Sequence, residues 1–205
     1  MGEPYSLAVV AGEHSGDTHA GNLARAFAAL SPESRWFGAG GPALVSAGLD
    51  CLVPSERLAV VGIGEVLTRL PSLWSALGTL KKALVERRPD ALVLVDFPDF
   101  NFRLARCAKR IGVPDLYYNT PQVWAWRQGR VRFLRETVRK ALVIFPFEET
   151  FLRERGVDAS FVGHPLASAP PPPSSREAFS ARHGMAPDAP YAALLPGSRH
   201  SEVTR

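Results

Sequence analysis

ALVLVDFPDFN, residues 91–101, is the segment from which the architecture of this chain can be predicted. Its first five residues form an unbroken apolar run that ends abruptly at Asp96, and the turn-like sequence Arg88-Pro89-Asp90 precedes it. A short apolar run bounded in this way predicts a strand buried on both faces, as in a parallel sheet. In open α/β sheets, ligands bind beyond the carboxyl ends of the strands. The sequence therefore places Asp96 at the edge of a ligand crevice.

Asp96 has two interpretations. A carboxylate at the end of a strand can accept a proton from a substrate hydroxyl, and apolar neighbours raise its pKa. The alternative is that the polar residues beyond the strand serve as helix caps, because Asp99 or Asn101 can cap a helix over residues 103–111. We interpret Asp99 and Asn101 mainly as caps, with Asn101 also a candidate substrate contact, and leave Asp96 open between the two interpretations.

Strands and helices alternate on both sides of this segment. Apolar runs predict strands at residues 6–11, 35–37, 51–53, 115–119, 141–145 and 159–162. Helical patterns lie between them, for example at residues 17–30, 103–111 and 147–155. Such alternation predicts an α/β fold with a doubly wound, Rossmann-like parallel sheet.

The sequence VGHPLASAPPPPSS follows the last of these strands. Four consecutive prolines continue neither a helix nor a sheet and form a semi-rigid spacer. We therefore predict one domain over residues 1–168, a linker over 169–175 and the start of a second domain over 176–205, with a helix at 175–183 and a strand at 191–195. A sheet needs more than one strand. We expect the second domain to be truncated, residues 174–205 to be mobile, and the chain to be inactive by itself.

Two strand-to-helix turns are candidate anion sites. In AGEHSGDTHAGN, Gly12 and Gly16 permit a tight turn, so the following helix begins at the crevice. Glu13 there is either stabilised by the helix dipole or hydrogen-bonded to a polyhydroxylated ligand. Arg199 in PGSRHSEVTR is suited to hold a diphosphate. Because the GxGxxG and GxxxxGK[ST] spacings are both absent, nothing predicts NAD or a Walker site.

An amphipathic stretch precedes the central strand. Its apolar positions are Val66, Leu67, Leu70, Leu73, Trp74, Leu77, Leu80 and Leu84. Pro71 interrupts the stripe, which predicts two helical pieces or a kink. Packing against the core is the favoured interpretation. A membrane surface is the alternative, because the stripe includes Trp74 and basic residues flank it.

PQVWAWR, residues 121–127, places two tryptophans in a loop. With Gln122, Trp124 and Trp126 form either a wall that contacts a sugar or an acyl chain, or plugs of the domain core. From Arg127 to Lys140 there are six basic residues and one acidic residue. This positive face fits a phosphate or an anionic surface, although a solvated helix face is the favoured interpretation.

Composition narrows the class of protein. Apolar residues make up 46% and charged residues 21% of the 205 residues, which is ordinary for a globular protein with a core. The net charge of +4 does not decide among nucleic acid, phosphate ligands and a membrane surface. Cys51 and Cys107 stand apart from each other and from any ligand pattern, which predicts a reducing compartment and no metal site. No apolar run approaches the ~18 residues that span a bilayer. We expect a cytosolic protein or one at the cytosolic face of a membrane.

Seven motifs occur in a fixed order: VAGEHSGD, VVGIGEVL, VLVDFPDFN, PQVWAWR, FPFE, FVGHPL and LLPGSR. Together they resemble the lipid-A-disaccharide synthase family, glycosyltransferases of the GT-B architecture. The resemblance covers essentially the whole chain, and family members are roughly twice as long. Asn119-Thr120 departs from the family pattern, which usually has an apolar residue and a serine there.

The resemblance implies an inverting transfer of 2,3-diacylglucosamine from its UDP derivative to the 6-hydroxyl of 2,3-diacylglucosamine 1-phosphate, in lipid A biosynthesis. It implies catalytic roles for Asp96 and Glu13, a phosphate contact at Arg199, and neither metal nor other cofactor. The remaining candidate substrate contacts are Ser198, Gly197, Asn101, Gln122, Trp124, Trp126 and Arg127.

Acylated substrates imply peripheral contact with the cytosolic face of the inner membrane. That shifts the interpretation of the amphipathic stripe toward a membrane contact by Leu67, Leu70, Leu73 and Trp74. Nucleic acid is not expected as a partner, because no RNA-binding signature is present. The alternative function is a non-catalytic Rossmann-like domain that binds an acylated phosphosugar or a membrane surface.

Overall fold

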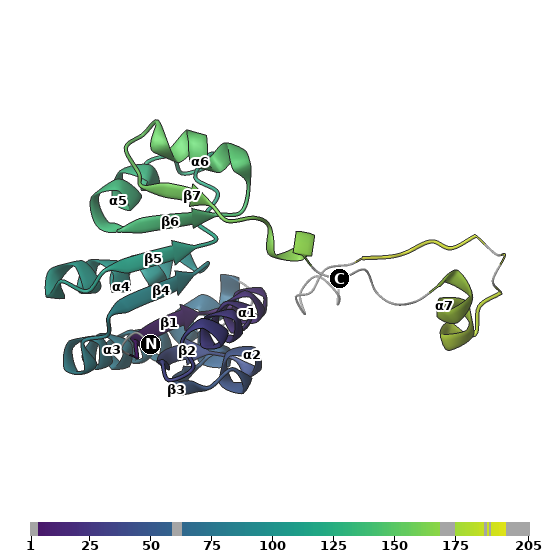
Figure 1. Cartoon of the computed structure of the whole chain (residues 1–205), viewed down its shortest axis with the longest axis horizontal. Helices are drawn as coiled ribbons and strands as arrows, with labels where there is room; N and C mark the ends of the chain where they lie inside the picture. Colours follow the sequence, from purple (N-terminus) through teal and green to yellow (C-terminus); the bar gives the residue numbers. More distant parts are fainter. Residues whose placement is uncertain (1–3, 59–62, 169–174, 187, 189, 196–205) are drawn as a thin grey trace.

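The computed structural model describes residues 4–58, 63–168, 175–186, 188 and 190–195, and for 63–69 and 168 the backbone alone. Within these residues the chain forms one seven-stranded sheet in the order β3-β2-β1-β4-β5-β6-β7 (Figure 1). Every strand pair is parallel. The strands are β1 (Ser6–Ala11), β2 (Arg35–Gly40), β3 (Leu49–Pro54), β4 (Ala91–Val95), β5 (Asp115–Tyr118), β6 (Lys140–Val143) and β7 (Ala159–Phe161). The predicted doubly wound parallel sheet is confirmed.

Helices cover both faces of this sheet. They are α1 (His14–Leu30), α2 (Pro42–Ser46), α3 (Ile63–Arg87), α4 (Pro98–Ile111), α5 (Arg130–Thr137), α6 (Pro146–Arg153) and α7 (Arg176–His183), with 3-10 turns at η1 (Ser55–Arg57) and η2 (Pro165–Ser168). Successive side chains of a strand point to opposite faces. In β1, Ala8 and Val10 accordingly pack with α3 to α6, whereas Leu7, Val9 and Ala11 pack with α1 and α2.

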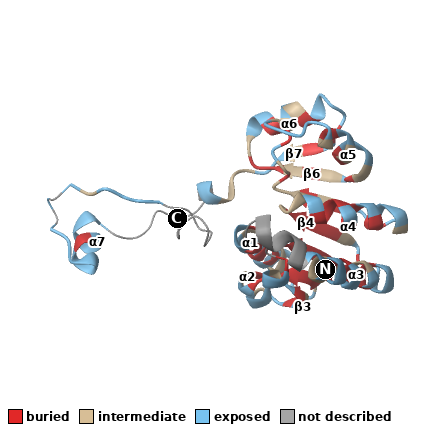
Figure 2. Ribbon diagram, turned by 180° about the vertical axis from the view of Figure 1, so that it is seen from behind, coloured by how far each residue is buried: buried red, intermediate tan, exposed pale blue. Residues whose placement is uncertain are grey.

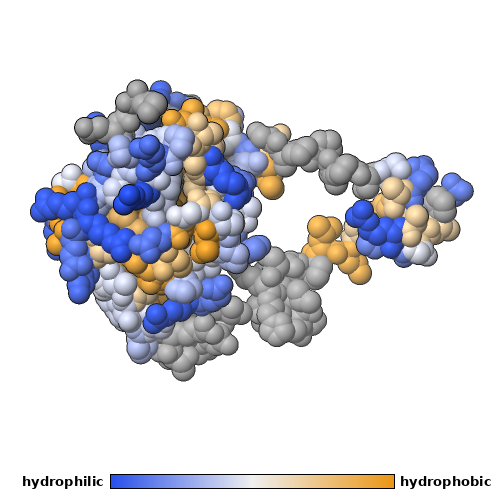
Figure 3. Space-filling view, turned by 60° about the horizontal axis from the view of Figure 1, so that its bottom comes forward, coloured by the Kyte–Doolittle hydropathy of each residue, from blue (hydrophilic) through white to orange (hydrophobic). Residues whose placement is uncertain are grey.

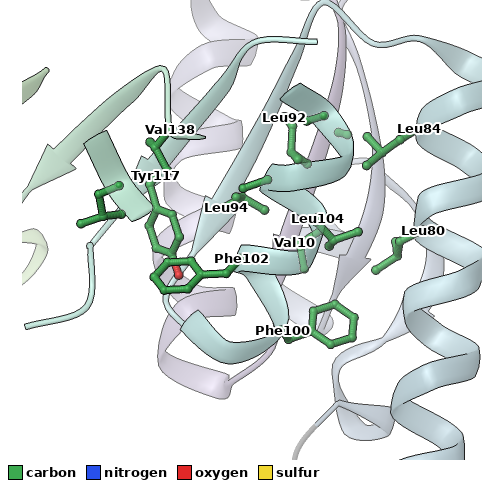
Figure 4. Packing of buried hydrophobic residues seen from close by; sticks show 14 of the residues in the cluster. Val10, Leu80, Leu84, Leu92, Leu94, Phe100, Phe102, Leu104, Tyr117 and Val138 are labelled. Atoms are coloured by element: carbon green, nitrogen blue, oxygen red, sulfur yellow. The ribbon is translucent and has the colours of Figure 1, made fainter. Parts of the chain in front are cut away.

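The buried residues concentrate in the strands and the inner faces of the helices (Figure 2). Figure 4 shows Leu80 and Leu84 of α3 beside Leu92 of β4 and Leu104 of α4, all of them buried. Nearby, the Tyr117 hydroxyl donates a hydrogen bond of 2.7 Å to the Asp96 carbonyl oxygen. The core is thereby tied directly to the carboxyl end of β4.

The strand order reverses direction at β1 and β4. From β1 the chain proceeds to β2 and β3 on one side, and from β4 it proceeds to β5, β6 and β7 on the other. Ala11 and Val95 are register partners, so the residues that follow these two strands lie side by side. Crevices at such switch points bind ligands in open α/β sheets.

The sequence and the structure disagree at two elements. The helix α3 runs through Pro71 as one element, so two separate helical pieces are excluded, and the alternative of a kink stays a prediction. Residues 191–195 form no strand in the structure, because no described strand pairs with them and a lone strand leaves its backbone groups unpaired. The helix α7, whose first turn is capped by the Ser175 hydroxyl at 3.2 Å from the Ala178 amide, lies apart from the sheet (Figure 1).

Candidate functional site

The backbone turns sharply at the end of β4. Asp96 and Phe97 both have a φ of 47°, which is the left-handed region that non-glycine residues rarely adopt. Consecutive residues in this region cost energy and occur where the surrounding structure holds them in place. Here the Asn101 side-chain amide and the Tyr117 hydroxyl donate to the Asp96 carbonyl oxygen at 2.8 and 2.7 Å. The turn is therefore fixed from both sides, and it directs the Asp96 side chain to the edge of the sheet.

The two oxygens of the Asp96 carboxylate have different surroundings. Oδ1 accepts a hydrogen bond of 2.7 Å from the side-chain amide of Asn119. Oδ2 faces the first turn of α1, where a Cβ added to Gly16 would lie 3.7 Å from it. The pKa of Asp96 is raised to about 6. Burial is the largest cause, the Asn119 hydrogen bond opposes the rise, and the negative charge of Glu13 adds to it. A carboxylate with this pKa can exchange a proton near neutral pH.

Glu13 lies where the sequence predicts it, at the start of α1. It occupies the N-cap position with an extended backbone, and its exposed side chain makes no capping hydrogen bond. Its charge acts on the pKa of Asp96. The structure therefore brings together the two carboxylates that the sequence names as catalytic candidates.

Gly12, in the turn between β1 and α1, is required because Phe97 lies close to it. A Cβ at Gly12 would lie 2.6 Å from Cδ1 of Phe97, so the aromatic ring occupies the space that any other residue needs. Phe97 follows Asp96 directly in the sequence. The β1–α1 turn and the β4–α4 turn are thus packed against each other at the switch point.

Asp17, the acid that ends the AGEHSGD sequence, has a structural role. It is 1% exposed, and its carboxylate accepts hydrogen bonds from the backbone amides of Gly41, Ala43 and Leu44 at 2.7, 2.9 and 3.2 Å. These are the amides at the start of α2, which lack partners within that helix. Asp17 thereby holds α2, an element that the sequence does not predict.

Asn101 does not have either of its predicted roles. Phe97 is the N-cap residue of α4 and no side chain caps the helix, so the capping interpretation of Asp99 and Asn101 is wrong. Asn101 is 0% exposed, and its side-chain amide donates to the Val95 and Asp96 carbonyl oxygens at 3.2 and 2.8 Å. Its position as a substrate contact is therefore corrected to a support of the β4–α4 turn.

The two tryptophans of PQVWAWR differ. Trp124 is half-buried, and its indole nitrogen donates a 2.9 Å hydrogen bond to Glu148, which is 3% exposed. Because Glu148 belongs to FPFE, this bond joins two of the sequence motifs, and Trp124 fits the interpretation as an internal anchor. Trp126 is 59% exposed, with the guanidinium carbons of Arg127 and Arg130 at 4.7 and 5.8 Å from its ring centroid. Trp126 therefore presents an aromatic surface to solvent.

Charged residues surround that aromatic surface. The Asp99 carboxylate pairs with Arg127 at 3.8 Å and also with Arg130. Gln122 is exposed, and its backbone carbonyl oxygen accepts hydrogen bonds from the backbone amides of Ala125 and Trp126 at 3.1 and 3.4 Å. The loop therefore presents polar and cationic side chains beside an exposed aromatic ring.

The amphipathic stripe of α3 divides into two parts. Leu77, Leu80 and Leu84 are buried in the core, as the core interpretation predicts. Leu70 and Trp74 are 38% and 57% exposed, and Leu73 is half-buried. The face drawn in Figure 3 shows apolar patches among strongly hydrophilic side chains. The expected exposure is thus found at these three positions, while the side chain of Leu67 lies outside the described part of the chain.

Asn119 is a site residue that sequence reasoning missed. Its φ of 54° is a value that asparagine adopts more readily than most residues. It directly follows β5, the neighbour of β4, and there it donates to Asp96. The available signal was the departure of Asn119-Thr120 from the family pattern.

Three predicted contacts, Gly197, Ser198 and Arg199, lie outside the described residues. Among the residues that are described, no helix is long and apolar enough to cross a membrane. The same part of the chain contains no group of three or more His, Cys, Asp or Glu side chains arranged to hold a metal ion.

Comparison with known proteins decides the family. A family model described as Lipid-A-disaccharide synthetase matches residues 7–205. This chain belongs to the lipid-A-disaccharide synthetase family. The Lipid-A-disaccharide synthase of Myxococcus xanthus is 48% identical over 205 residues, covering 100% of this chain and 54% of that protein. The enzyme of the same name from Geobacter metallireducens is 46% identical over 197 residues, covering 96% and 51%. The chain thus spans about half the length of the curated relatives it matches.

Solved structures with a similar fold are glycosyltransferases. Glycyrrhiza uralensis UGT73P12, complexed with glycyrrhetinic acid 3-O-monoglucuronide, has a TM-score of 0.56 at 12% identity, covering 80% of this chain and 49% of that one. Arabidopsis thaliana UGT89C1 complexed with UDP has a TM-score of 0.52 at 13% identity, covering 78% and 48%. At these identities the likeness shows the fold alone, and it agrees with the sheet described above.

Proposed function

We propose that this chain forms the acceptor-side half of an inverting glycosyltransferase. The reaction transfers 2,3-diacylglucosamine from its UDP derivative to the 6-hydroxyl of 2,3-diacylglucosamine 1-phosphate. Family membership supports the reaction class. The catalytic role is assigned to Asp96 because its carboxylate has a pKa of about 6 and lies at the switch point of the sheet. In this proposal residues 1–168 are the acceptor domain, 169–175 the linker and 176–205 the start of the donor domain.

Asp96 acts as the general base. Its Oδ1 is held by Asn119, so Oδ2 receives the proton of the acceptor hydroxyl. As that proton leaves, the hydroxyl oxygen forms a bond to the anomeric carbon of the donor sugar, the bond to UDP breaks, and the configuration inverts. Glu13 has two roles here. Its charge keeps the pKa of Asp96 high, and its carboxylate accepts hydrogen bonds from the acceptor sugar.

The substrates bind on either side of this base. Trp126, Arg127 and Gln122 contact the phosphosugar acceptor. Trp126 supplies an exposed aromatic ring, and the other two side chains supply a cationic and a polar group beside it. Trp124 supports this wall from within, through its bond to Glu148. The donor diphosphate binds at Gly197, Ser198 and Arg199, because a guanidinium suits phosphate oxygens. Binding of both substrates involves neither a metal nor another cofactor.

The protein works at the cytosolic face of the inner membrane. The exposed apolar side chains of Leu70 and Trp74, with the half-buried Leu73, support a peripheral contact with the bilayer, and Leu67 belongs to the same stripe. Apolar side chains flanked by basic residues are typical of a helix that lies at the interface. This contact gives the enzyme access to acylated substrates.

The test is a chimera in which residues 1–205 are joined to the remaining half of the Myxococcus xanthus relative. Asp96→Asn should lower the turnover of UDP-2,3-diacylglucosamine by at least ~100-fold, the low end for loss of a general base. Circular dichroism should be unchanged, since the asparagine keeps an oxygen to accept from Asn119. Near-normal turnover in this variant would refute the assignment of Asp96.

A further inference from the structure

Two arginines converge on one carboxylate beside the PQVWAWR loop. The Asp99 carboxylate pairs with Arg127 through one oxygen, at 3.8 Å, and with Arg130 through the other. The side chain of Asp99 is 74% exposed, whereas that of Arg130 is 14% exposed. A nearly buried guanidinium is thus paired with a carboxylate that is open to water.

Aromatic rings hold both guanidiniums in place. The guanidinium carbon of Arg127 lies 4.7 Å from the Trp126 ring centroid. That of Arg130 lies 5.8 Å from the same centroid and 5.6 Å from the centroid of the Phe102 ring. A guanidinium that stacks on a ring directs its N–H groups outward in the plane of the fork, toward an acceptor. Donors that are positioned before a ligand binds lose less conformational entropy on binding.

The arginine pair belongs to the same cluster of side chains as the candidate base. Arg130 packs on Phe102, whose ring centroid lies 5.9 Å from that of Tyr117. Figure 4 shows the Phe102 ring beside the Tyr117 hydroxyl, which donates to the Asp96 carbonyl oxygen at 2.7 Å. The contacts are therefore continuous from Arg130 to the turn that carries Asp96, as a single phosphosugar that touches both would require.

The Asp99 carboxylate is a weak partner for these cations. An ion pair that water can reach contributes little to stability, because solvent screening and the ordering of two side chains offset the attraction. A phosphate monoester carries a charge of about −1.5 to −2 at pH 7 and three strong acceptor oxygens, which is more of both than a carboxylate has. Arginine forks bind such oxygens in a bidentate manner. A phosphate monoester therefore gains more from the two arginines than Asp99 does.

We infer that Arg127 and Arg130 bind the phosphate of the sugar acceptor, and that this phosphate displaces the carboxylate of Asp99. The inference rests on the proposed function and adds to it the site of one substrate group. Before the acceptor binds, Asp99 offsets the repulsion between the two guanidiniums. When the phosphate takes its place, the Asp99 side chain turns toward water in the first turn of α4, where the helix dipole stabilises its charge.

Opposite changes in affinity test the displacement. The probe is glucosamine 1-phosphate, titrated against the 205-residue chain and followed by phosphorus NMR. Arg127→Gln and Arg130→Gln should each weaken its binding by about 10- to 100-fold, because each removes a charged hydrogen-bond donor. Asp99→Asn should tighten its binding by about two- to fivefold, because a competing charge is removed.

Two further variants serve as controls. Arg132→Gln should leave the affinity within about twofold, because Arg132 lies on the same helix as Arg130 but pairs with Glu136 and has a side chain that is 77% exposed. Arg130→Lys keeps the charge and loses the planar fork, so it should weaken binding by about tenfold with an unchanged thermal midpoint. If Arg130→Gln lowers the thermal midpoint, Arg127→Gln decides the test, because the Arg127 side chain is 54% exposed.

The outcomes separate this inference from the proposed function. Binding of the probe with unchanged affinity in both arginine-to-glutamine variants overturns the phosphate site and leaves the acceptor role intact. Weaker binding in Asp99→Asn shows that Asp99 positions the arginines, and it overturns the displacement. Absence of binding by the unsubstituted chain contradicts the acceptor role and the phosphate site together.

A lipid headgroup offers the same phosphate chemistry, and phosphatidylglycerol vesicles distinguish this source. Sedimentation with the vesicles should be similar for the unsubstituted chain and for Arg127→Gln, since the inference assigns the arginines to a sugar phosphate. Loss of vesicle binding in the arginine variants, with unchanged affinity for glucosamine 1-phosphate, would assign the site to a headgroup and overturn the inference.

Discussion

Two carboxylates with raised pKa values lie at opposite ends of neighbouring strands. Asp96 follows the carboxyl end of β4, and Asp115 begins β5 at its amino end. Burial is the largest cause that raises the pKa of each, and both values are about 6. Asp96 is half-buried at the switch point, whereas Asp115 is 2% exposed. The same electrostatic shift therefore occurs at a place that a substrate can reach and at one that it cannot.

The contacts of Asp115 explain why it is structural. One of its oxygens accepts a 2.9 Å hydrogen bond from the Arg139 amide just before β6, and the other is buried without a hydrogen-bond partner. The hydrogen bond from the Arg139 amide and, to a smaller extent, the charge of Lys109 lower the pKa of Asp115 and only partly offset the effect of burial. A raised pKa thus reports desolvation, and it indicates a functional site only where the group also faces a crevice.

The largest expected effect is on turnover, and it distinguishes Asp96 from Asp115. In the chimera, Asp115→Asn should leave turnover within about twofold of the unsubstituted protein, against the ~100-fold loss expected for Asp96→Asn. Steady-state kinetics on the two variants, prepared in parallel, measure the difference. Equal losses in both would mean that the shift in Asp96 has no more catalytic meaning than the shift in Asp115.

The next effect is on stability, and here the two variants should agree. Each carboxyl has a folded-state pKa of about 6, above its ordinary value of 3.8, so the folded protein retains a proton that the unfolded chain releases. The contribution of each carboxyl to the free energy of unfolding is then greatest below about pH 4 and falls as the pH rises to about 6. Asn at either position should raise the free energy of unfolding at pH 8 by up to about 3 kcal/mol.

Urea unfolding of the 205-residue chain at pH 4 and pH 8 measures this gain. The gain should be much smaller at pH 4, where the carboxyl is protonated in the folded state and partly protonated in the unfolded state. A gain that is the same at both pH values would show that it comes from packing and not from removal of a desolvated charge.

The same pair of residues shows how far sequence reasoning reaches. Apolar runs predicted the strands because burial in a parallel sheet demands them, and the residue after such a run, Asp96, was found by its position. Asp115 lies inside its strand at a polar first position, and nothing in the sequence distinguishes it from an exposed charge. Its burial depends on elements that lie much further along the sequence.

Tertiary contacts explain the other misses. Asp17 caps α2 from 24 residues away, a contact that local patterns do not contain. Asn101 looks like a cap because of its residue type, but the left-handed turn at Asp96 and Phe97 replaces side-chain capping. The sequence therefore predicted that Asp96 lies at the carboxyl end of β4, but it did not predict the contacts of the residues that support this turn.

Two glycines, Gly12 and Gly78, offer a further comparison. Gly12→Ala places a Cβ 2.6 Å from Phe97 at the switch point, whereas a Cβ at Gly78, in α3, has nothing within 4 Å. The first substitution should destabilise the chain by about 1–3 kcal/mol, because the ring must move. Gly78→Ala should stabilise it by about 0.5–1 kcal/mol, since alanine is the better helix residue. Thermal unfolding of both variants checks this, and equal midpoints would contradict the close contact of Phe97 with the first turn.

The smallest effect is expected at Asn119, whose side-chain amide donates to Asp96, whereas a backbone amide donates to Asp115. Asn119→Gly removes the amide that donates to Asp96 but keeps the left-handed backbone, because glycine tolerates a φ of 54°. That hydrogen bond lowers the pKa of Asp96, so its loss should raise the pKa further. The acid limb of the turnover–pH profile of the chimera should then move to higher pH by roughly one unit, with little loss of kcat on the alkaline plateau. An unmoved acid limb with a uniformly lower kcat would show that Asn119 shapes the turn and does not act on the charge of Asp96.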